Sequence, residues 1–137
     1  MLAPATDPPL TAAKVRSWHK EGVHPFLGWL DDQENPVAYG EINSMLYSDG
    51  QMWLGHILVA PSRRHMGLGR CLVRNLLEIA FEEYRAWHVC LIVFPANLAA
   101  VRCYEAVGMT RVGMERWRHP ETGEISMLAR LEIGRSR

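Results

Sequence analysis

One segment constrains the fold more than any other, because the spacing of its apolar residues changes twice. Met52 to Val59 has the composition of a strand, Leu68 to Tyr84 has apolar residues at helical spacing, and His88 to Phe94 is a continuous apolar run. A strand followed by a helix and a buried strand predicts a parallel pair joined by a crossover. This unit is expected to form the centre of the fold.

Shorter elements flank this unit on both sides, as two predicted hairpins and two predicted helices. The hairpin strands are 25–30 with 37–42 and 109–117 with 125–133, and the helices are 11–20 and 97–107. The fold class is therefore α/β (α+β), with a mixed sheet in a single domain spanning 1–137. We expect residues 1–10 to be irregular, because they carry three prolines, and residues 134–137 to form a frayed tail.

Composition excludes several classes of protein. The 15 basic and 15 acidic side chains cancel, so we expect no nucleic-acid partner. Cys71, Cys90 and Cys103 are odd in number and lack CxxC spacing, which favours buried free thiols over a disulfide framework or a zinc site. The chain shows neither a signal peptide nor a membrane span. We expect a cytoplasmic protein with no membrane partner.

The loop between the predicted strand and helix is rich in glycine and arginine. The first turn of a helix presents unpaired N–H groups at the positive end of the helix dipole, where a phosphate binds readily. Gly67 and Gly69 leave room for it, and Arg64 and Arg70 add positive charge. A nucleoside-triphosphate loop would need lysine in place of Arg70, and a dinucleotide fingerprint would need glycine in place of Leu72. The alternative to a phosphate site is a strand–helix turn in which the glycines serve only packing.

Two motifs in this order resemble the GNAT superfamily of N-acetyltransferases. The first is its acetyl-CoA loop, matched by Val59, Pro61, Arg64, Gly67, Gly69 and Leu72. The second is its following helix, matched by Asn97, Ala100, Tyr104, Gly108 and Met109, with methionine where the family usually has phenylalanine. The resemblance covers about residues 52–117, while the family's first strand and helix are reduced in this chain.

The resemblance implies a twisted mixed sheet whose two central parallel strands splay apart around the pantetheine arm of acetyl-CoA. The strand backbone would pair with the pantetheine amides, the loop amides would hold the pyrophosphate, and Asn97 would contact CoA, cap its own helix, or do both. No metal is expected. The implied cofactor-binding residues are Ile57, Leu58, Val59, Arg64, His65, Met66, Gly67, Leu68, Gly69, Arg70, Asn97 and Tyr104.

The implied reaction is acetyl transfer from acetyl-CoA to a primary amine of a small molecule or a protein, by direct attack in a ternary complex. A backbone N–H near Leu58 and Val59 would stabilise the oxyanion. Tyr104 would be the general acid, because a phenol is protonated at neutral pH; packing on the sheet is its alternative role. An acyl-CoA-binding module without turnover is the alternative function, and an interaction domain without a ligand is a third.

The general base is left open by the sequence. The two positions where family members carry a glutamate hold Trp53 and Ile92 here, and neither side chain takes a proton. Glu41 and His56 are the remaining candidates, although either could be structural. Loss of the amine proton to water is another alternative.

The acceptor and the oligomeric state are also open. Phe26, Trp29 and Trp53 could line an apolar acceptor pocket or fill the core. A homodimer could form through the C-terminal hairpin.

Overall fold

The computed structural model describes residues 23–28, 37–44, 50–60 and 67–135 of the 137-residue chain, so the predicted helix over 11–20 lies outside the described residues. No helix within these ranges is long and apolar enough to cross a membrane. The elements are β1 (Val23–Gly28), β2 (Ala38–Ser44), β3 (Gln51–Val59), α2 (Leu68–Glu82), β4 (His88–Val93), α3 (Leu98–Ala106), β5 (Thr110–Arg118) and β6 (Ile125–Gly134).

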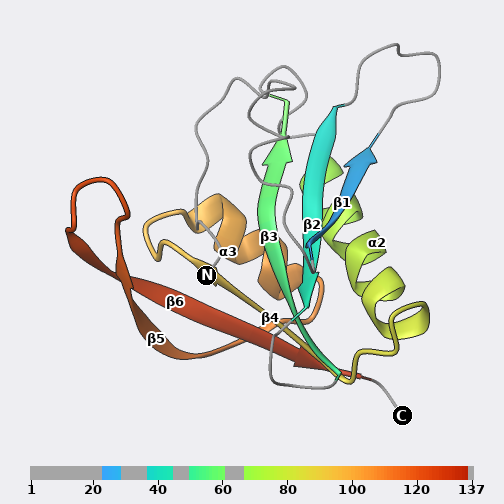
Figure 1. The fold of residues 1–137 in the computed structure, drawn as a ribbon. Coiled ribbons are helices and arrows are strands. Elements are labelled where there is room, and N and C mark those ends of the chain that lie inside the picture. The colour runs from blue at the N-terminus through green and yellow to red at the C-terminus, as the bar shows by residue number, and fades with distance from the viewer. Residues whose placement is uncertain (1–22, 29–36, 45–49, 61–66, 136–137) are drawn as a thin grey trace.

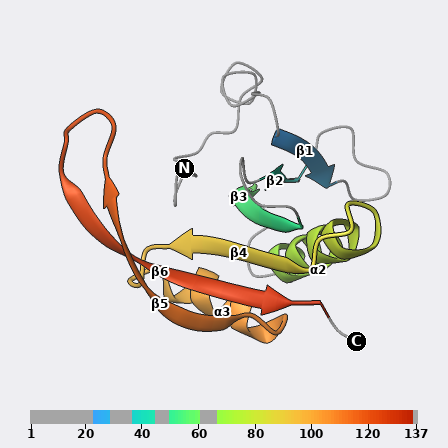
Figure 2. The same ribbon diagram turned by 60° about the horizontal axis from the view of Figure 1, so that its bottom comes forward.

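The six strands form one mixed sheet in the order β1-β2-β3-β4-β6-β5. All neighbouring strands are antiparallel except β3 and β4, which are parallel and joined through α2. Both helices lie on the same side of the sheet, and the end of the β5–β6 hairpin projects beyond the other strands (Figures 1 and 2). This arrangement confirms the predicted mixed sheet with a central strand–helix–strand unit.

β3 and β4 are paired only where they begin. Their register runs from Gln51 opposite His88 to Trp53 opposite Cys90, and both strands continue beyond that point. Figure 1 shows β3 turning away from β4. We call the gap in the ladder after Trp53 and Cys90 the β3–β4 opening, and that last pair its closed end. The predicted splay of the central parallel strands is confirmed.

The core lies between the sheet and the two helices. It is lined on the helix side by Leu72, Val73, Leu76, Leu77 and Ala80 of α2, with Tyr104 of α3 beside them. Alternate residues of β2, β4 and β6 complete it, as expected from the period of two in a strand. The opposite face of the sheet carries a second, smaller apolar cluster of Ile92, Trp117 and Leu128. The main core therefore lies on the helix side of the sheet, and the smaller apolar cluster lies on the opposite face.

Gly40 allows α2 to approach the sheet closely. A Cβ on Gly40 would come within 2.7 Å of Leu76 Cδ1 and 3.1 Å of Ile57 Cδ1. Because a side chain there would push α2 away, glycine in the middle of β2 has a packing role.

The predicted element boundaries differ from the observed ones by one or two residues, but two predictions are wrong in substance. The expected frayed tail from 134 fails at its start, because Gly134 belongs to β6 opposite His88 and Arg135 N donates to Trp87 O at 2.9 Å. Not all cysteines are buried: Cys71 lies on the exposed side of α2. An apolar sequence neighbourhood does not distinguish the two faces of an amphipathic helix.

Candidate active site

The N-terminus of α2 lies at the end of β3 and has no side-chain cap. Gly67 is its N-cap residue, with φ of 76°, a left-handed conformation that costs other residues about 1 kcal/mol or more. Among the residues that the structure describes, no side chain accepts from the first-turn amides, and that turn contains no acidic residue. The amides at the start of α2 therefore suit an anion, and the assignment of Gly67 and Leu68 to a cofactor stays a prediction. Arg64, His65 and Met66 lie outside the described residues.

Gly69 brings this helix terminus against the end of the strand. A Cβ on Gly69 would lie 3.7 Å from Val59 Cγ2 and 3.8 Å from Cys103 Sγ. The absence of a side chain therefore keeps the first turn of α2 in contact with both β3 and α3. Arg70 follows it with its side chain exposed. Any phosphate on these amides would lie close to Val59.

The second half of β3 directs part of its backbone into the β3–β4 opening. Ala60 N donates to Val37 O at 2.8 Å, and the register then places Val59 opposite Ala38 and Leu58 opposite Tyr39. In an antiparallel ladder, hydrogen-bonded and non-hydrogen-bonded pairs alternate. Leu58 therefore bonds to β2, while the N–H and C=O groups of Val59 point towards the opening. Ile57, two residues earlier, has the same orientation.

A β-bulge lies where β3 leaves β4. Glu41 is opposite Gly55 and Tyr39 is opposite Leu58, so two residues of β3 face the single residue between them on β2. The bulged residue His56 has φ of 48°, a left-handed conformation that non-glycine residues adopt rarely. Bulges often redirect a side chain beside a functional site. Here the bulge turns His56 towards Glu41.

The two candidate bases form one hydrogen-bonded pair. His56 Nδ1 lies 2.7 Å from Glu41 Oε1, and the hydroxyl of Tyr39 donates to Glu41 Oε2, also at 2.7 Å. The Glu41 side chain is 1% exposed and that of His56 is 13% exposed. A buried carboxylate is stable only when it is paired, and here both of its oxygens have partners. Sequence reasoning had treated Glu41 and His56 as alternatives.

This pairing sets the chemistry of the imidazole. An ionised carboxylate only accepts hydrogen bonds, so His56 donates from Nδ1 and its lone pair lies on Nε2. Burial, together with the hydrogen bond to Glu41, raises the pKa of Tyr39 well above its usual value. Tyr39 therefore keeps its proton and acts as a donor to Glu41. The arrangement orients a histidine whose Nε2 can accept a proton.

Tyr104 lies on α3, within the core. Its side chain is 8% exposed, and burial raises its pKa well above the ordinary value for a phenol. The hydroxyl is therefore protonated at neutral pH, as predicted. A higher pKa also makes it a weaker acid, which favours hydrogen-bond donation over complete proton transfer.

The remaining predicted residues have mixed outcomes. Asn97 caps α3, because its Oδ1 accepts from Ala100 N at 3.2 Å. Phe26 packs against the core on the helix side and Trp53 packs against the smaller cluster on the opposite face, so for Phe26 the structure favours the alternative that it fills the core. Trp29 lies outside the described residues. The register of β1 and β3 against β2 decides which face of the sheet each side chain occupies, and a single sequence does not determine that register.

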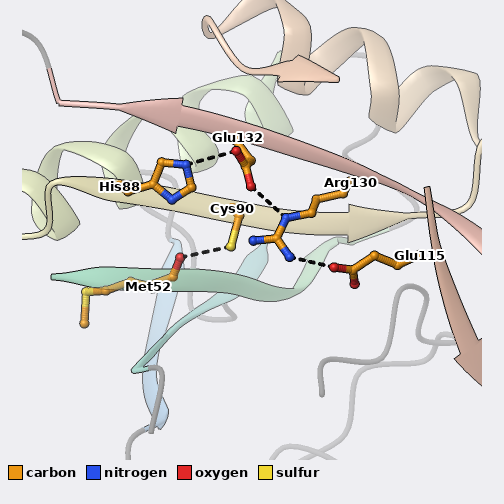
Figure 3. Close-up of polar contacts among 6 residues, drawn as sticks. All are labelled: Met52, His88, Cys90, Glu115, Arg130 and Glu132. Carbon is orange, nitrogen blue, oxygen red and sulfur yellow. Dashed lines mark hydrogen bonds and ion pairs between the residues drawn. The ribbon is translucent and has the colours of Figure 1, made fainter. Parts of the chain in front are cut away.

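A network of polar side chains surrounds the closed end (Figure 3). Arg130 of β6 donates to Glu115 Oε1 at 2.6 Å and to Glu132 Oε1 at 2.7 Å, and its guanidinium lies 4.7 Å from the centre of the Trp53 ring. Because Trp53 belongs to β3, this contact joins the two halves of the sheet where they begin to separate.

The cysteine at the closed end is a hydrogen-bond donor. Burial raises the pKa of Cys90 to about 12, so the thiol keeps its proton at neutral pH. Its Sγ donates to Met52 O at 3.6 Å, from β4 to β3 (Figure 3). A protonated thiol is a poor nucleophile, so Cys90 is not suited to carry an acyl group.

Sequence reasoning missed Tyr39 and Arg130. Tyr39 shares one face of β2 with Glu41 and Asn43, and that period of two was a readable signal. Arg130 has the same spacing to Glu132, but its other two partners, Glu115 and Trp53, lie on different strands and could not be read from local sequence.

Comparisons with known proteins identify the family. Residues 2–109 match the acetyltransferase (GNAT) family, and the chain belongs to that family. It is similar to an aminoglycoside N(6')-acetyltransferase type 1 from Klebsiella pneumoniae, at 30% identity over 104 residues, 69% of this chain and 51% of that protein. It is also similar to a kanamycin resistance protein from Rhizobium radiobacter, at 39% identity over 85 residues, 62% of this chain and 67% of that protein.

Solved structures support the same fold. An aminoglycoside acetyltransferase in complex with coenzyme A has a TM-score of 0.69 and 27% identity, covering 84% of this chain and 68% of its own. A mutant spermidine N-acetyltransferase from Vibrio cholerae has a TM-score of 0.72 and 22% identity, covering 89% and 71%. The chain spans about half the length of the first curated relative, at 51%.

Proposed function

We propose that this protein is an N-acetyltransferase that moves the acetyl group of acetyl-CoA to a primary amine by direct attack. The observation that carries the proposal is the arrangement along β3. An uncapped helix N-terminus lies at one end of the β3–β4 opening, and the Glu41–His56 pair lies at the bulge within it. The helix N-terminus suits a phosphate, and the Glu41–His56 pair suits proton acceptance. Acetyl transfer from CoA requires both.

The residues of the opening fit acetyl-CoA. The amides of Gly67, Leu68 and Gly69 would hold the pyrophosphate, with Arg70 supplying charge. The backbone groups of Ile57 and Val59 would pair with the pantetheine amides like an added strand. The solved relative that binds coenzyme A supports this assignment. Asn97, the N-cap residue of α3, is a further proposed contact of CoA in addition to its role as a cap.

The catalytic groups divide the reaction into three tasks. His56 takes the proton of the attacking amine at Nε2, and Glu41 fixes the orientation of the ring and stabilises the imidazolium that forms. A backbone N–H of β3 beside the bulge stabilises the negative charge on the thioester oxygen. The hydroxyl of Tyr104 donates to the departing sulfur. Acetyl-CoA supplies the activated acyl group.

We further propose that the acceptor is a small molecule rich in amines. The curated relatives named above are an aminoglycoside acetyltransferase and a kanamycin resistance protein, and both names refer to polyamine-containing antibiotics. The face of the sheet opposite the helices carries Glu41, Glu115 and Glu132. Glu115 and Glu132 share the single positive charge of Arg130, and the negative charge that is left over would attract a cationic acceptor.

A thiol-release assay tests the proposal. The protein is incubated with acetyl-CoA and a panel of aminoglycosides, linear polyamines and peptides with free N-termini, and release of CoA is measured. We expect release with at least one cationic small molecule and its loss in His56→Ala. A rise in melting temperature with acetyl-CoA but no release across the panel would favour a binding module without turnover. No rise at concentrations far above a micromolar dissociation constant would contradict CoA binding itself.

A further inference from the structure

The length of the β3–β4 opening determines where a thioester would lie. The pantetheine arm from the phosphate to the sulfur contains roughly as many chain bonds as four extended residues. Its phosphate end is anchored close to Val59, because the first turn of α2 contacts that residue through Gly69. Counting back four residues along β3 places the sulfur near Gly55. This is beside the bulge that holds His56, in agreement with the proposed base.

Little strand remains between that point and the closed end. Only Leu54 separates Gly55 from Trp53, where the ladder to Cys90 closes. One to two residues of strand correspond to about 3–7 Å. An acetyl group fits within this length, and a chain of about six carbons does not.

The closed end is walled on both faces of the sheet. On the helix side, Leu54 and Leu91 are each 2% exposed and belong to the main core. On the other face stands Trp53, which Arg130 holds through its ring contact while Glu115 and Glu132 fix the guanidinium. Figure 3 shows Arg130 and Cys90 on the same side of β4, next to β3. A longer acyl chain would have to displace one of these walls.

We propose that the closed end of the β3–β4 opening limits the length of the acyl group, as an acyl-length gate. Trp53 forms its outer wall, and Arg130 is the positioning residue that holds the Trp53 ring in place. The gate restricts the protein to acetyl and propionyl donors. This inference rests on the proposed function, because it assumes that the pantetheine arm occupies the opening.

The test measures binding of CoA, acetyl-CoA, butyryl-CoA and hexanoyl-CoA by titration calorimetry, so that no acceptor is needed. For the unmodified protein we expect CoA and acetyl-CoA to bind with similar affinity, butyryl-CoA more weakly, and hexanoyl-CoA at least about tenfold more weakly than acetyl-CoA. Equal affinity for all four would overturn the gate while leaving the proposed function intact. Absence of binding by CoA and acetyl-CoA would overturn both.

Three variants locate the gate. Trp53→Ala removes the outer wall and is expected to bring hexanoyl-CoA within about threefold of acetyl-CoA. Arg130→Met, which frees the ring without removing it, is expected to give a partial gain and keeps the test informative where Trp53→Ala does not fold. The matched control is Trp87→Ala, because Trp87 is 54% exposed and precedes β4. An unchanged profile in folded Trp53→Ala, or a changed one in Trp87→Ala, would contradict the assignment.

Discussion

The sheet contains two histidine–carboxylate pairs that differ in their surroundings. In the first, His56 Nδ1 lies 2.7 Å from Glu41, whose side chain is 1% exposed. In the second, His88 Nε2 lies 3.1 Å from Glu132, whose side chain is 24% exposed and which also binds Arg130. The carboxylate of the first pair is shared with a neutral phenol, and that of the second with a cation.

This difference supports our proposal that the Glu41–His56 pair is catalytic, and it favours a structural role for the His88–Glu132 pair. Arg130 compensates much of the charge of Glu132, so that carboxylate has less negative potential with which to stabilise an imidazolium. His88 also lies where β3 and β4 are still paired, whereas His56 lies at the bulge beside the opening. The same two side chains can therefore take different roles, and position along the strands decides between them.

Replacing each histidine by alanine should give the largest contrast. His56→Ala is expected to lower kcat with the best acceptor about 10²- to 10⁴-fold, because general base catalysis contributes that much. His88→Ala is expected to lower the melting temperature with little change in kcat per folded molecule. Steady-state kinetics over a range of pH, together with thermal unfolding, measure both effects.

The carboxylates provide the matched control for that prediction. Glu41→Gln keeps the size of the side chain but removes its charge, and we expect a loss in kcat of at least about tenfold. Glu132→Gln should leave kcat nearly unchanged. Equal losses in the two variants would show that the two pairs are not functionally distinct.

Removal of one hydroxyl from the core should have the next largest effect. Tyr104→Phe preserves the packing of the ring, so the free energy of unfolding should change little, while kcat should fall about tenfold through loss of the donor to sulfur. Saturating concentrations of both substrates are required. Unchanged turnover would assign Tyr104 to packing alone.

The start of α2 can be tested by adding single methyl groups. Gly67→Ala forces a side chain into φ of 76° and should cost about 1 kcal/mol of stability as well as weaken CoA binding. Gly69→Ala meets Val59 and Cys103 only at ordinary contact distance, so its effect on stability should be smaller. Denaturant unfolding and calorimetric titration measure the two quantities. A more stable Gly67→Ala would contradict the described helix start.

The smallest expected effect concerns the His88–Glu132 pair and is measured by acid titration of stability. Burial alone would raise the pKa of Glu132, but hydrogen bonding from Arg130 and the charge of His88 lower it below its usual value. A depressed pKa adds stability above the unfolded-state value, near 4.3, and this is lost as pH falls through the folded-state value. Between about pH 5 and 3, the unmodified protein should lose about 1 kcal/mol more than Glu132→Gln. An equal loss of stability with falling pH in the unmodified protein and in Glu132→Gln would contradict this prediction.

Local patterns in the sequence predicted the elements and the glycine-rich start of α2. Apolar spacing identified α2, glycines at 67 and 69 identified its N-terminus, and Asn97 identified the start of α3. These signals lie within a few residues of the structures they determine. Backbone preference and helix dipole act over that range, so one sequence is enough to read them.

Contacts between strands far apart in sequence were not predictable in the same way. Glu41 and His56 meet only because a bulge shifts the register of β2 against β3, and no local residue pattern specified that bulge. Arg130 reaches Trp53 across β4, so its contact depends on the strand order. The same uncertainty in register left open whether Phe26 lines a pocket or fills the core.

Amide hydrogen exchange along β3 tests the central claim most directly, because it compares the paired and open halves of a single strand. Acetyl-CoA should slow exchange at Ile57 and Val59, whose amides point into the opening, and at Leu68 and Gly69 at the start of α2. The already paired stretch 51–53 should not respond. Protection confined to α2 or absent throughout, with acetyl-CoA at saturation, would contradict pantetheine binding in the β3–β4 opening.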